Sequence, residues 1–153
     1  VGKRKFMKLF DKIFFSTTFG GETLSIVSAL ETIKMLKNKN VITKIKKFSK
    51  KFVKDIEQTI SKYELDKILK VEGVWWRPAF GVFKEENRNY LTLLRKNLIK
   101  NKILIGNSFN FCFSHTDKKI YKNIMTKVEK ALKETKENIK FNKKEKVSYS
   151  VRS

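Results

Sequence analysis

Cysteine, histidine and proline are scarce in this sequence, with one residue of each among 153. The single cysteine, Cys112, excludes a disulfide within the chain and fits a reducing compartment, so we expect a cytoplasmic protein in which Cys112 is a small buried residue. One cysteine and one histidine cannot form a Cys/His metal site, and the acidic residues are scattered along the chain. We therefore expect no metal.

Long apolar runs are also missing. No stretch reaches the roughly 18 apolar residues that cross a bilayer, and the N-terminus lacks the apolar segment of a signal peptide, so we expect no membrane partner. The chain begins with Val1 and not with Met, which leads us to expect a truncated or processed start. With 41% apolar residues and 13 Phe, the sequence can still bury a core.

Positive charge is abundant: 36 Lys and Arg against 15 Asp and Glu give a net charge of +21. The excess is mainly Lys and is spread over every segment, whereas proteins that read bases depend on Arg and on aromatics placed within the basic surface. We therefore expect a solvated basic surface and no nucleic-acid partner. A basic module that binds nucleic acid or another polyanion stays open as the alternative function.

Apolar spacing predicts several helices. Residues 41–63 give the clearest pattern, because Val41, Ile45, Phe48 and later apolar residues recur every three to four positions while Lys fills the other faces. Thr116 or Asp117 is a suitable N-cap for a final helix. Other helices are predicted at 3–10, 22–36 and 87–100.

Apolar and aromatic runs predict short strands. Residues 71–76 and 79–83 flank Arg77-Pro78, and 103–105 and 109–113 flank the turn at 106–108; the run 13–15 is also strand-like. The element order predicts an α/β fold in which helices pack on a small, largely antiparallel sheet. The expected core of the region from Leu65 to Ile139 comprises Phe80, Val82, Leu94, Leu98, Ile103, Phe111, Ile124 and Val128.

Residues 16–21, Ser-Thr-Thr-Phe-Gly-Gly, directly precede the predicted helix at Glu22. Hydroxyl groups, two glycines and the free backbone N–H groups of a helix start are the parts of an anion site, which could hold a phosphate. Thr and Gly also form ordinary turns and caps, so on this local pattern alone a structural loop is the favoured interpretation.

A longer stretch, FFSTTFGGETLS at 14–25 followed by Ala-Leu-Glu-Thr at 29–32, resembles the segment after the cofactor lysine in class III pyridoxal-phosphate (PLP) aminotransferases. In that family a threonine before a glycine-containing turn binds the phosphate of PLP across a dimer interface, and Thr18 stands at its position. Thr17 stands where the family usually has Gly, and Glu22-Thr23 stands where many members have Asn-Pro. The resemblance thus implies Thr18, with Thr17 beside it, as cofactor-binding residues.

A second motif, FNFCFSHTD at 109–117, resembles the strand that enters the last helix in glutamate-1-semialdehyde aminomutase-like members. Members that recognise an α-carboxylate commonly have an Arg near the final strands, and this chain has none between Ile103 and Asp117. The resemblance therefore favours the aminomutase-like branch. It implies the C-terminal small domain of fold-type I PLP enzymes.

The resemblance also implies a domain division and a function. It divides the chain into a remnant of the large cofactor-binding domain (1–21), a linking helix with the following helix (22–63), the small α/β domain (64–140) and a flexible basic tail (141–153). In the complete enzyme such a chain helps to move an amino group between a small-molecule donor and acceptor, as a homodimer or with a complementary large-domain chain. The cofactor lysine is expected upstream, so we assign no catalytic residue and expect no transamination by the chain alone.

Two further features invite a functional interpretation. His115, the only histidine, is a potential general acid or base, but it precedes a helix cap and has no second catalytic candidate near it in sequence, so a structural role is favoured. The run Trp75-Trp76-Arg77-Pro78 suggests either a substrate contact or, as the favoured interpretation, hydrophobic core beside a paired surface Arg.

Overall fold

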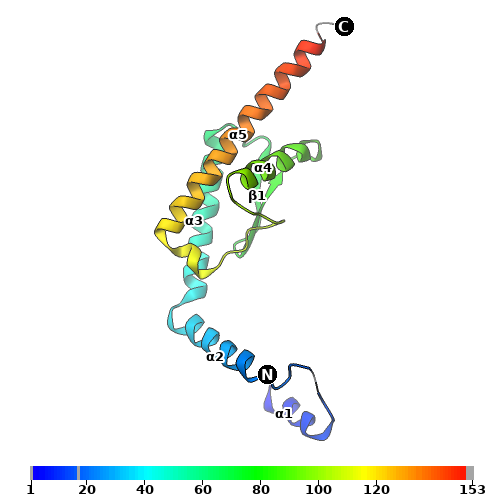
Figure 1. The fold of residues 1–153 in the computed structure, drawn as a ribbon, viewed down its shortest axis with the longest axis vertical. Coiled ribbons are helices and arrows are strands. Elements are labelled where there is room, and N and C mark those ends of the chain that lie inside the picture. Colours follow the sequence, from blue (N-terminus) through cyan, green and yellow to red (C-terminus); the bar gives the residue numbers. More distant parts are fainter. Residues whose placement is uncertain (1, 17, 151–153) are drawn as a thin grey trace. The chain divides into compact units, whose positions relative to one another are not determined.

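The computed structural model describes residues 2–16 and 18–150, with side chains as far as Phe141. The chain separates into two compact units, 1–40 and 41–153 (Figure 1). The first unit contains the Thr18 segment. The second contains the hydrophobic core.

Short helices and one longer helix make up the first unit. Helix α1 (Arg4–Met7) continues into the 3₁₀ helix η1 (Lys8–Lys12), and α2 spans Thr23–Asn38, which confirms the helices predicted at 3–10 and 22–36. Residues 13–15 have no strand conformation. That strand-like expectation was wrong, because a strand needs a neighbour to complete its backbone hydrogen bonds and none lies beside these residues in the described part of the chain.

Three helices dominate the second unit: α3 (Val41–Lys62), α4 (Arg88–Lys100) and α5 (Lys118–Ser150). The predicted periodicity of α3 is confirmed, because its apolar stripe is buried while its Lys residues face solvent. Asp117 caps α5 as expected: its Oδ1 accepts hydrogen bonds from the backbone N–H groups of Lys119, at 2.8 Å, and Ile120, at 3.1 Å. Two short 3₁₀ helices, η2 (Glu85–Asn87) and η3 (Phe113–Thr116), precede α4 and α5.

Two antiparallel strands, β1 (Leu69–Val74) and β2 (Arg77–Val82), form a hairpin where two strands were predicted, but the expected connection at Arg77-Pro78 was wrong: the turn is Trp75-Trp76, and Arg77 and Pro78 belong to β2. Val71 pairs with Phe80, and the ladder ends where Val74 pairs with Arg77. Gly73 has a φ angle of +95°, a conformation that side chains with a Cβ rarely adopt. Helix α3 contacts β1 and helix α4 contacts β2, so the hairpin is covered by helices as the α/β expectation requires (Figure 1).

The two further predicted strands, 103–105 and 109–113, are not strands. They run as extended, irregular chain, with Phe113 already in η3. The backbone N–H of Phe109 donates a 2.8 Å hydrogen bond to the carbonyl of Pro78 in β2. Pro78 has no N–H to return a bond from this position, so a ladder cannot continue here and the segment packs through its side chains instead.

The core lies between α3, α4, α5 and the hairpin. Of the eight expected core residues, four are buried and the other four pack against the core while partly exposed. The sequence-based core omitted α3, whose Phe52 and Ile56 are 2% and 0% exposed. The buried apolar residues that form one connected core are Phe48, Phe52, Ile56, Ile60, Leu65, Leu69, Phe80, Leu94, Leu98, Phe109, Val128, Ala131, Leu132 and Ile139.

Helix α5 extends into the segment expected to be a flexible tail. Its backbone is helical to Ser150, although the sequence after Phe141 has no hydrophobic period. Lys and Glu favour helix without any buried face, and this propensity accounts for the continuation. Residues 151–153 of the expected tail lie outside the described part of the chain.

Candidate functional site

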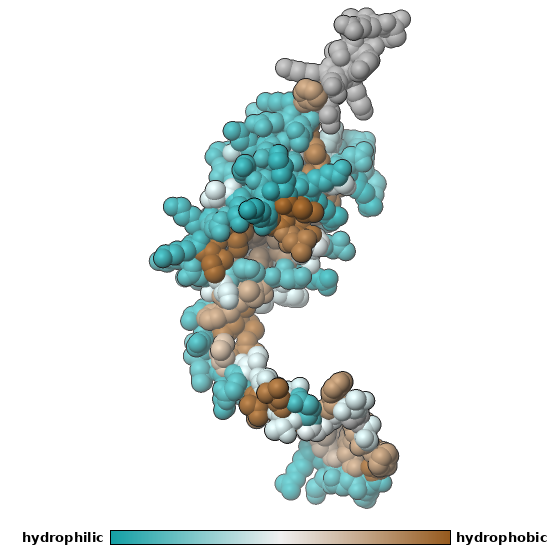
Figure 2. All heavy atoms as spheres, viewed as in Figure 1, coloured by the Kyte–Doolittle hydropathy of each residue, from teal (hydrophilic) through white to brown (hydrophobic). Residues whose placement is uncertain are grey.

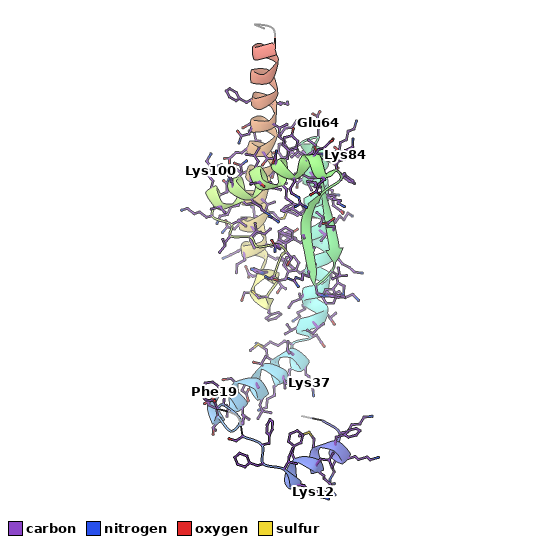
Figure 3. The ribbon with its side chains drawn as sticks, turned by 90° about the vertical axis from the view of Figure 1, so that its right-hand side faces the viewer. Lys12, Phe19, Lys37, Glu64, Lys84 and Lys100 are labelled. Atoms are coloured by element: carbon purple, nitrogen blue, oxygen red, sulfur yellow. The ribbon has the colours of Figure 1, made fainter. Side chains whose placement is uncertain are left out.

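Residues 18–21 form a turn, which Glu22 joins to the start of α2, and Thr18 is the first residue of that turn. Thr18, Phe19 and Gly21 are exposed, and the backbone N–H of Glu22 donates to the carbonyl of Phe19 at 3.3 Å. Figure 3 shows Phe19 beside the start of this helix. Thr17, the second predicted cofactor-binding residue, lies outside the described residues. The structure thus presents Thr18 on an exposed, glycine-containing turn.

The start of α2 is capped by its own sequence. The Glu22 carboxylate accepts hydrogen bonds from the backbone N–H groups of Leu24, at 2.9 Å, and Ser25, at 2.5 Å. Hydrogen bonds from the side chain and backbone of Ser25 lower the pKa of Glu22, so the cap is charged at neutral pH. The expectation that the N–H groups of the helix start are free for an anion was therefore wrong for these two donors. An anion at this turn could accept a hydrogen bond from the Thr18 hydroxyl, but the negative charge of the Glu22 carboxylate would repel it.

The first unit exposes most of its apolar side chains. Phe14, Phe15 and Phe19 are 97%, 64% and 78% exposed. Helix α2 contains no buried residue, although its apolar residues follow helical spacing. Figure 2 shows this apolar surface in brown over the N-terminal elements. Exposed apolar surface of this kind is typical of protein–protein and membrane interaction sites and of ligand-binding grooves.

His115 and Cys112 lie in the second unit, at the start of η3. The backbone N–H of Cys112 donates to Nδ1 of His115 at 3.0 Å, and the imidazole stacks on Phe48 with ring centroids 6.3 Å apart. Cys112 is exposed, so its expected burial was wrong. The alternation along the extended segment explains this: Phe111 turns inward onto Phe48, and its neighbour Cys112 turns outward.

The Trp75-Trp76-Arg77-Pro78 run forms the tip of the hairpin. Trp75 is half-buried and its carbonyl accepts a hydrogen bond from the Ser49 hydroxyl, whereas Trp76 is 59% exposed. Arg77 Nε donates to the Ser108 hydroxyl at 3.0 Å. The core interpretation therefore holds for Trp75 and Pro78 but not for Trp76, and the partner of Arg77 is a hydroxyl.

A polar cluster joins α3 to α5. The Tyr121 hydroxyl donates to the Asp55 carboxylate, Lys51 forms an ion pair with Asp55, and Lys51 Nζ lies 3.0 Å from the Tyr121 oxygen. Burial alone would raise the pKa of Asp55, but hydrogen bonds from Lys51 and Tyr121 outweigh it and lower that pKa. These groups satisfy one another across a helix interface, so the cluster holds the fold together.

Among the described residues, no three His, Cys, Asp or Glu side chains come together as metal ligands. In that same part of the chain, none of the helices combines the length and apolar composition needed to cross a membrane.

Comparison with known proteins supplies one similarity. The chain is 28% identical over 126 residues to a 3-aminobutyryl-CoA aminotransferase of Cloacimonas acidaminovorans (strain Evry). This similarity indicates an aminotransferase-related origin. The match covers 76% of this chain but 29% of the relative, so the chain spans less than a third of that protein's length. Neither a protein-family profile nor a solved structure matches the chain.

Proposed function

We propose that this chain is the C-terminal part of a class III, PLP-dependent aminotransferase of the aminomutase-like branch. In the complete enzyme it moves an amino group between a small-molecule donor and acceptor, together with a large domain that carries the cofactor lysine. The observation that carries this proposal is the similarity to an aminotransferase across 76% of the chain. The motif at 14–25 and the helix-covered antiparallel hairpin support it.

Thr18 is the residue of this chain that we propose contacts the cofactor phosphate. Its exposed position on a glycine-containing turn fits a hydroxyl donor to a phosphate held by a second subunit. It fits one contact and not a whole phosphate site, because the Glu22 carboxylate already occupies two N–H donors of α2. The remaining donors must come from the large domain. When bound, PLP supplies the electron-withdrawing ring for the chemistry at the amino-bearing carbon.

The exposed apolar surface of the first unit is the proposed contact with that large domain and with a partner subunit. Phe14, Phe15 and Phe19 lie on both sides of Thr18 in sequence, so covering them would exclude water around the threonine. Burying an exposed aromatic side chain contributes about 1.5 to 3 kcal/mol, enough to hold two domains together when several act jointly. The chain then forms a functional site only with its partner.

A chimera with the relative tests this proposal. The part of the Cloacimonas acidaminovorans enzyme that this chain matches is replaced by residues 1–153, and PLP binding is measured by the visible absorbance of the bound cofactor. The matched control is the same enzyme truncated at the junction. We expect the chimera to bind PLP with at least tenfold higher affinity than the truncated control, because the chain restores the phosphate contact and covers the site.

A folded chimera that binds PLP no better than the truncated control would contradict the proposal. Circular dichroism and the dimer mass from light scattering establish folding independently of the cofactor. A chimera that does not fold is replaced by mixing the truncated enzyme with the separate 153-residue chain, and no gain in PLP binding there would count equally against the proposal.

A further inference from the structure

The sheet of the second unit has only two strands, and among the described residues no further strand covers the outer edge of β1. The outer edge of β2 is already in use, because the carbonyl of Pro78 accepts the backbone N–H of Phe109. Isolated sheets of two strands are marginally stable, and folded domains usually have three or more strands. An uncovered edge presents backbone N–H and C=O groups that can pair with another strand.

The register of the hairpin shows which backbone groups of β1 face away from β2. The Phe83 N–H donates to the Ile68 carbonyl at 3.3 Å, and hydrogen-bonded pairs then alternate with pairs that exchange no bonds. Val71 and Gly73 fall in the second kind of pair, so their N–H and C=O groups point outward. Pro78, which has no N–H, pairs with Gly73 and thus stands where no bond to β1 is needed.

These outward groups have no other backbone partner. Apart from the hairpin itself, no backbone hydrogen bond among the described residues involves Val71 or Gly73. Val71 is half-buried and Gly73 is exposed. The Leu69 N–H, by contrast, donates to the Leu65 carbonyl at 2.8 Å. The open edge therefore starts after Leu69 and runs to the turn of the hairpin.

A groove of about 310 Å³ lies between this edge and α3. The side chains of Val53 and Glu57 line it from the helix, and residues 71–75 line it from the hairpin. The Ser49 hydroxyl donates to the Trp75 carbonyl and so fixes the turn of the hairpin against α3. A sheet edge with side-chain pockets beside it is the arrangement in which proteins bind an added strand.

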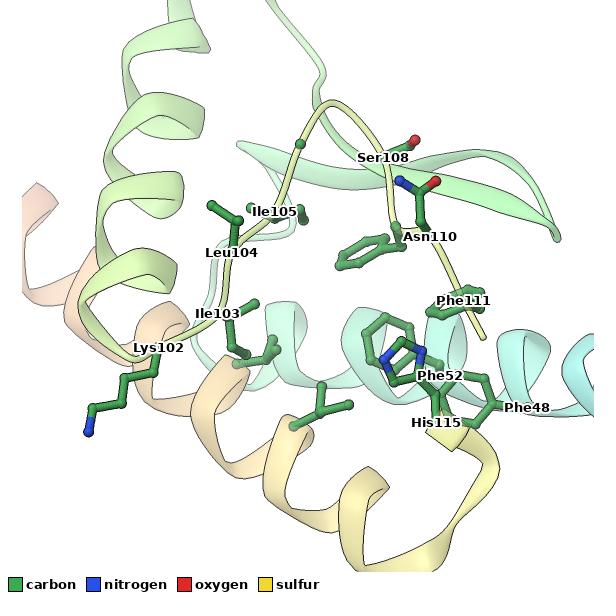
Figure 4. Close-up of a pocket in the computed structure, with 14 residues that line it drawn as sticks. Phe48, Phe52, Lys102, Ile103, Leu104, Ile105, Ser108, Asn110, Phe111 and His115 are labelled. Atoms are coloured by element: carbon green, nitrogen blue, oxygen red, sulfur yellow. The ribbon is translucent and has the colours of Figure 1, made fainter. Parts of the chain in front are cut away.

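A separate cavity of the second unit offers no such selectivity. It measures about 300 Å³ and lies between the extended segment 102–111 and the helices α3 and α5 (Figure 4). Its walls are mostly apolar, and Lys102 points away from it (Figure 4). The backbone groups of β1, by contrast, select an extended polypeptide.

We propose that β1 receives a third strand from the part of the aminotransferase that this chain does not contain. This inference rests on the proposed function. The match covers 29% of the relative, so most of that enzyme lies outside the matched region and can supply the strand. The backbone groups of the added strand pair with those of Val71 and Gly73, and its side chains on one face enter the groove beside α3. The partner then holds the second unit as well as the exposed apolar surface of the first.

Amide hydrogen exchange tests this proposal. The ¹⁵N-labelled 153-residue chain is measured by NMR alone and after mixing with the Cloacimonas acidaminovorans enzyme truncated at the junction. We expect exchange of the Val71 and Gly73 amides to slow by about tenfold or more in the complex, because each gains a backbone partner. The amides of Lys70 and Glu72 already pair with β2 and should slow less, which gives an alternating pattern along β1.

Val71→Pro is the matching variant. It removes one outward N–H and no hydrogen bond of the hairpin, and the proline ring obstructs the edge. We expect it to weaken association with the truncated enzyme by about tenfold, measured by isothermal titration calorimetry. Val71→Ala is the control, because it shortens the side chain but keeps the N–H, and it should weaken association less. Circular dichroism establishes that both variants fold.

The outcomes separate this inference from the proposed function. Association that protects amides of the first unit but leaves those of Val71 and Gly73 unchanged would overturn the third strand and leave the proposed function standing. Equal slowing of all amides of β1 would indicate general stabilisation and would also contradict strand addition. No association at all would overturn both proposals. If Val71→Pro does not fold, the exchange pattern of the unaltered chain decides.

Discussion

At the scale of single residues, a buried hydrogen bond between two side chains joins α4 to α5. The Asn97 amide donates to the Thr135 hydroxyl at 2.9 Å, and the two residues are 6% and 0% exposed. The Thr135 hydroxyl in turn donates to the carbonyl of Ala131 at 2.7 Å. Polar groups this deeply buried are stable only when they are paired, so the pair fixes how the two helices meet.

Thr135→Val is expected to destabilise the chain by about 1 to 3 kcal/mol, because it leaves the Asn97 amide buried without its acceptor. Urea unfolding followed by circular dichroism measures the change. Thr126→Val is the matched control, since Thr126 makes the same kind of bond to a carbonyl of its own helix but is exposed. Equal losses in the two variants would show that the buried pair contributes nothing specific.

Substitution of Thr18 tests the proposal that this residue contacts the phosphate of PLP. In the PLP-binding chimera, Thr18→Ala removes one hydrogen bond to a charged phosphate, a loss of roughly 1.5 to 3 kcal/mol or about 10- to 100-fold in PLP affinity. Thr17→Ala should have a smaller effect, because the resembled family has Gly there. A cofactor titration compares the three proteins. If only Thr17→Ala loses PLP affinity, the phosphate contact belongs to Thr17. If neither variant loses PLP affinity, this turn does not contact the phosphate.

Among the elements, the hairpin depends on Gly73. A Cβ at this residue would lie 2.7 Å from the Arg77 carbonyl oxygen, and its φ angle of +95° is unfavourable for other residues. Gly73→Ala should therefore cost about 1 to 3 kcal/mol of unfolding free energy. At Gly81 a Cβ would meet only the mobile end of the Glu72 side chain, so Gly81→Ala should change stability little. Thermal unfolding of both variants distinguishes strain at one position from a general intolerance of the hairpin.

The interface between α3 and α5 makes stability depend on pH. The pKa of Asp55 is lowered below its ordinary value of 3.8, so the folded chain binds fewer protons than the unfolded chain near that pH. The stabilisation is present above the unfolded pKa and is lost as pH falls through the folded value. Asp55→Asn should lower stability at pH 7 by about 1 to 2 kcal/mol and flatten the loss of stability below pH 4. Asp66→Asn, which removes an exposed carboxylate, is the control. If the stability of Asp55→Asn still falls steeply below pH 4, this account is wrong.

Most elements could be predicted from the sequence because their signals are local. Apolar periodicity located α3 and α4, Asp117 marked the start of α5, and two apolar runs located the strands of the hairpin, although the turn lies at Trp75-Trp76 and not at the expected Arg77-Pro78. Residues 103–105 and 109–113 were assigned to strands because they are short apolar and aromatic runs on either side of a turn. Whether such a segment joins a sheet depends on a neighbour with matching backbone groups, and Pro78 does not offer one.

For the molecule as a whole, the candidate site was only partly predictable. The position of Thr18 before a helix followed from the sequence, but the capping of that helix by Glu22 depends on a side-chain conformation that the pattern does not specify. The cavity beside 102–111 was missed entirely, because it combines residues from α3, α5 and the extended segment. The positive φ of Lys102 is likewise visible only in the structure.

The most direct test of the central claim is amino transfer by the chimera that joins this chain to the large domain of the Cloacimonas acidaminovorans relative. With PLP and the relative's own substrate, the rate of amino-group transfer is measured for the chimera, the truncated enzyme and the isolated chain. We expect transfer by the chimera alone, because the large domain supplies the cofactor lysine and this chain completes the site. A folded chimera that binds PLP and transfers no faster than the truncated enzyme would contradict an aminotransferase function for this chain.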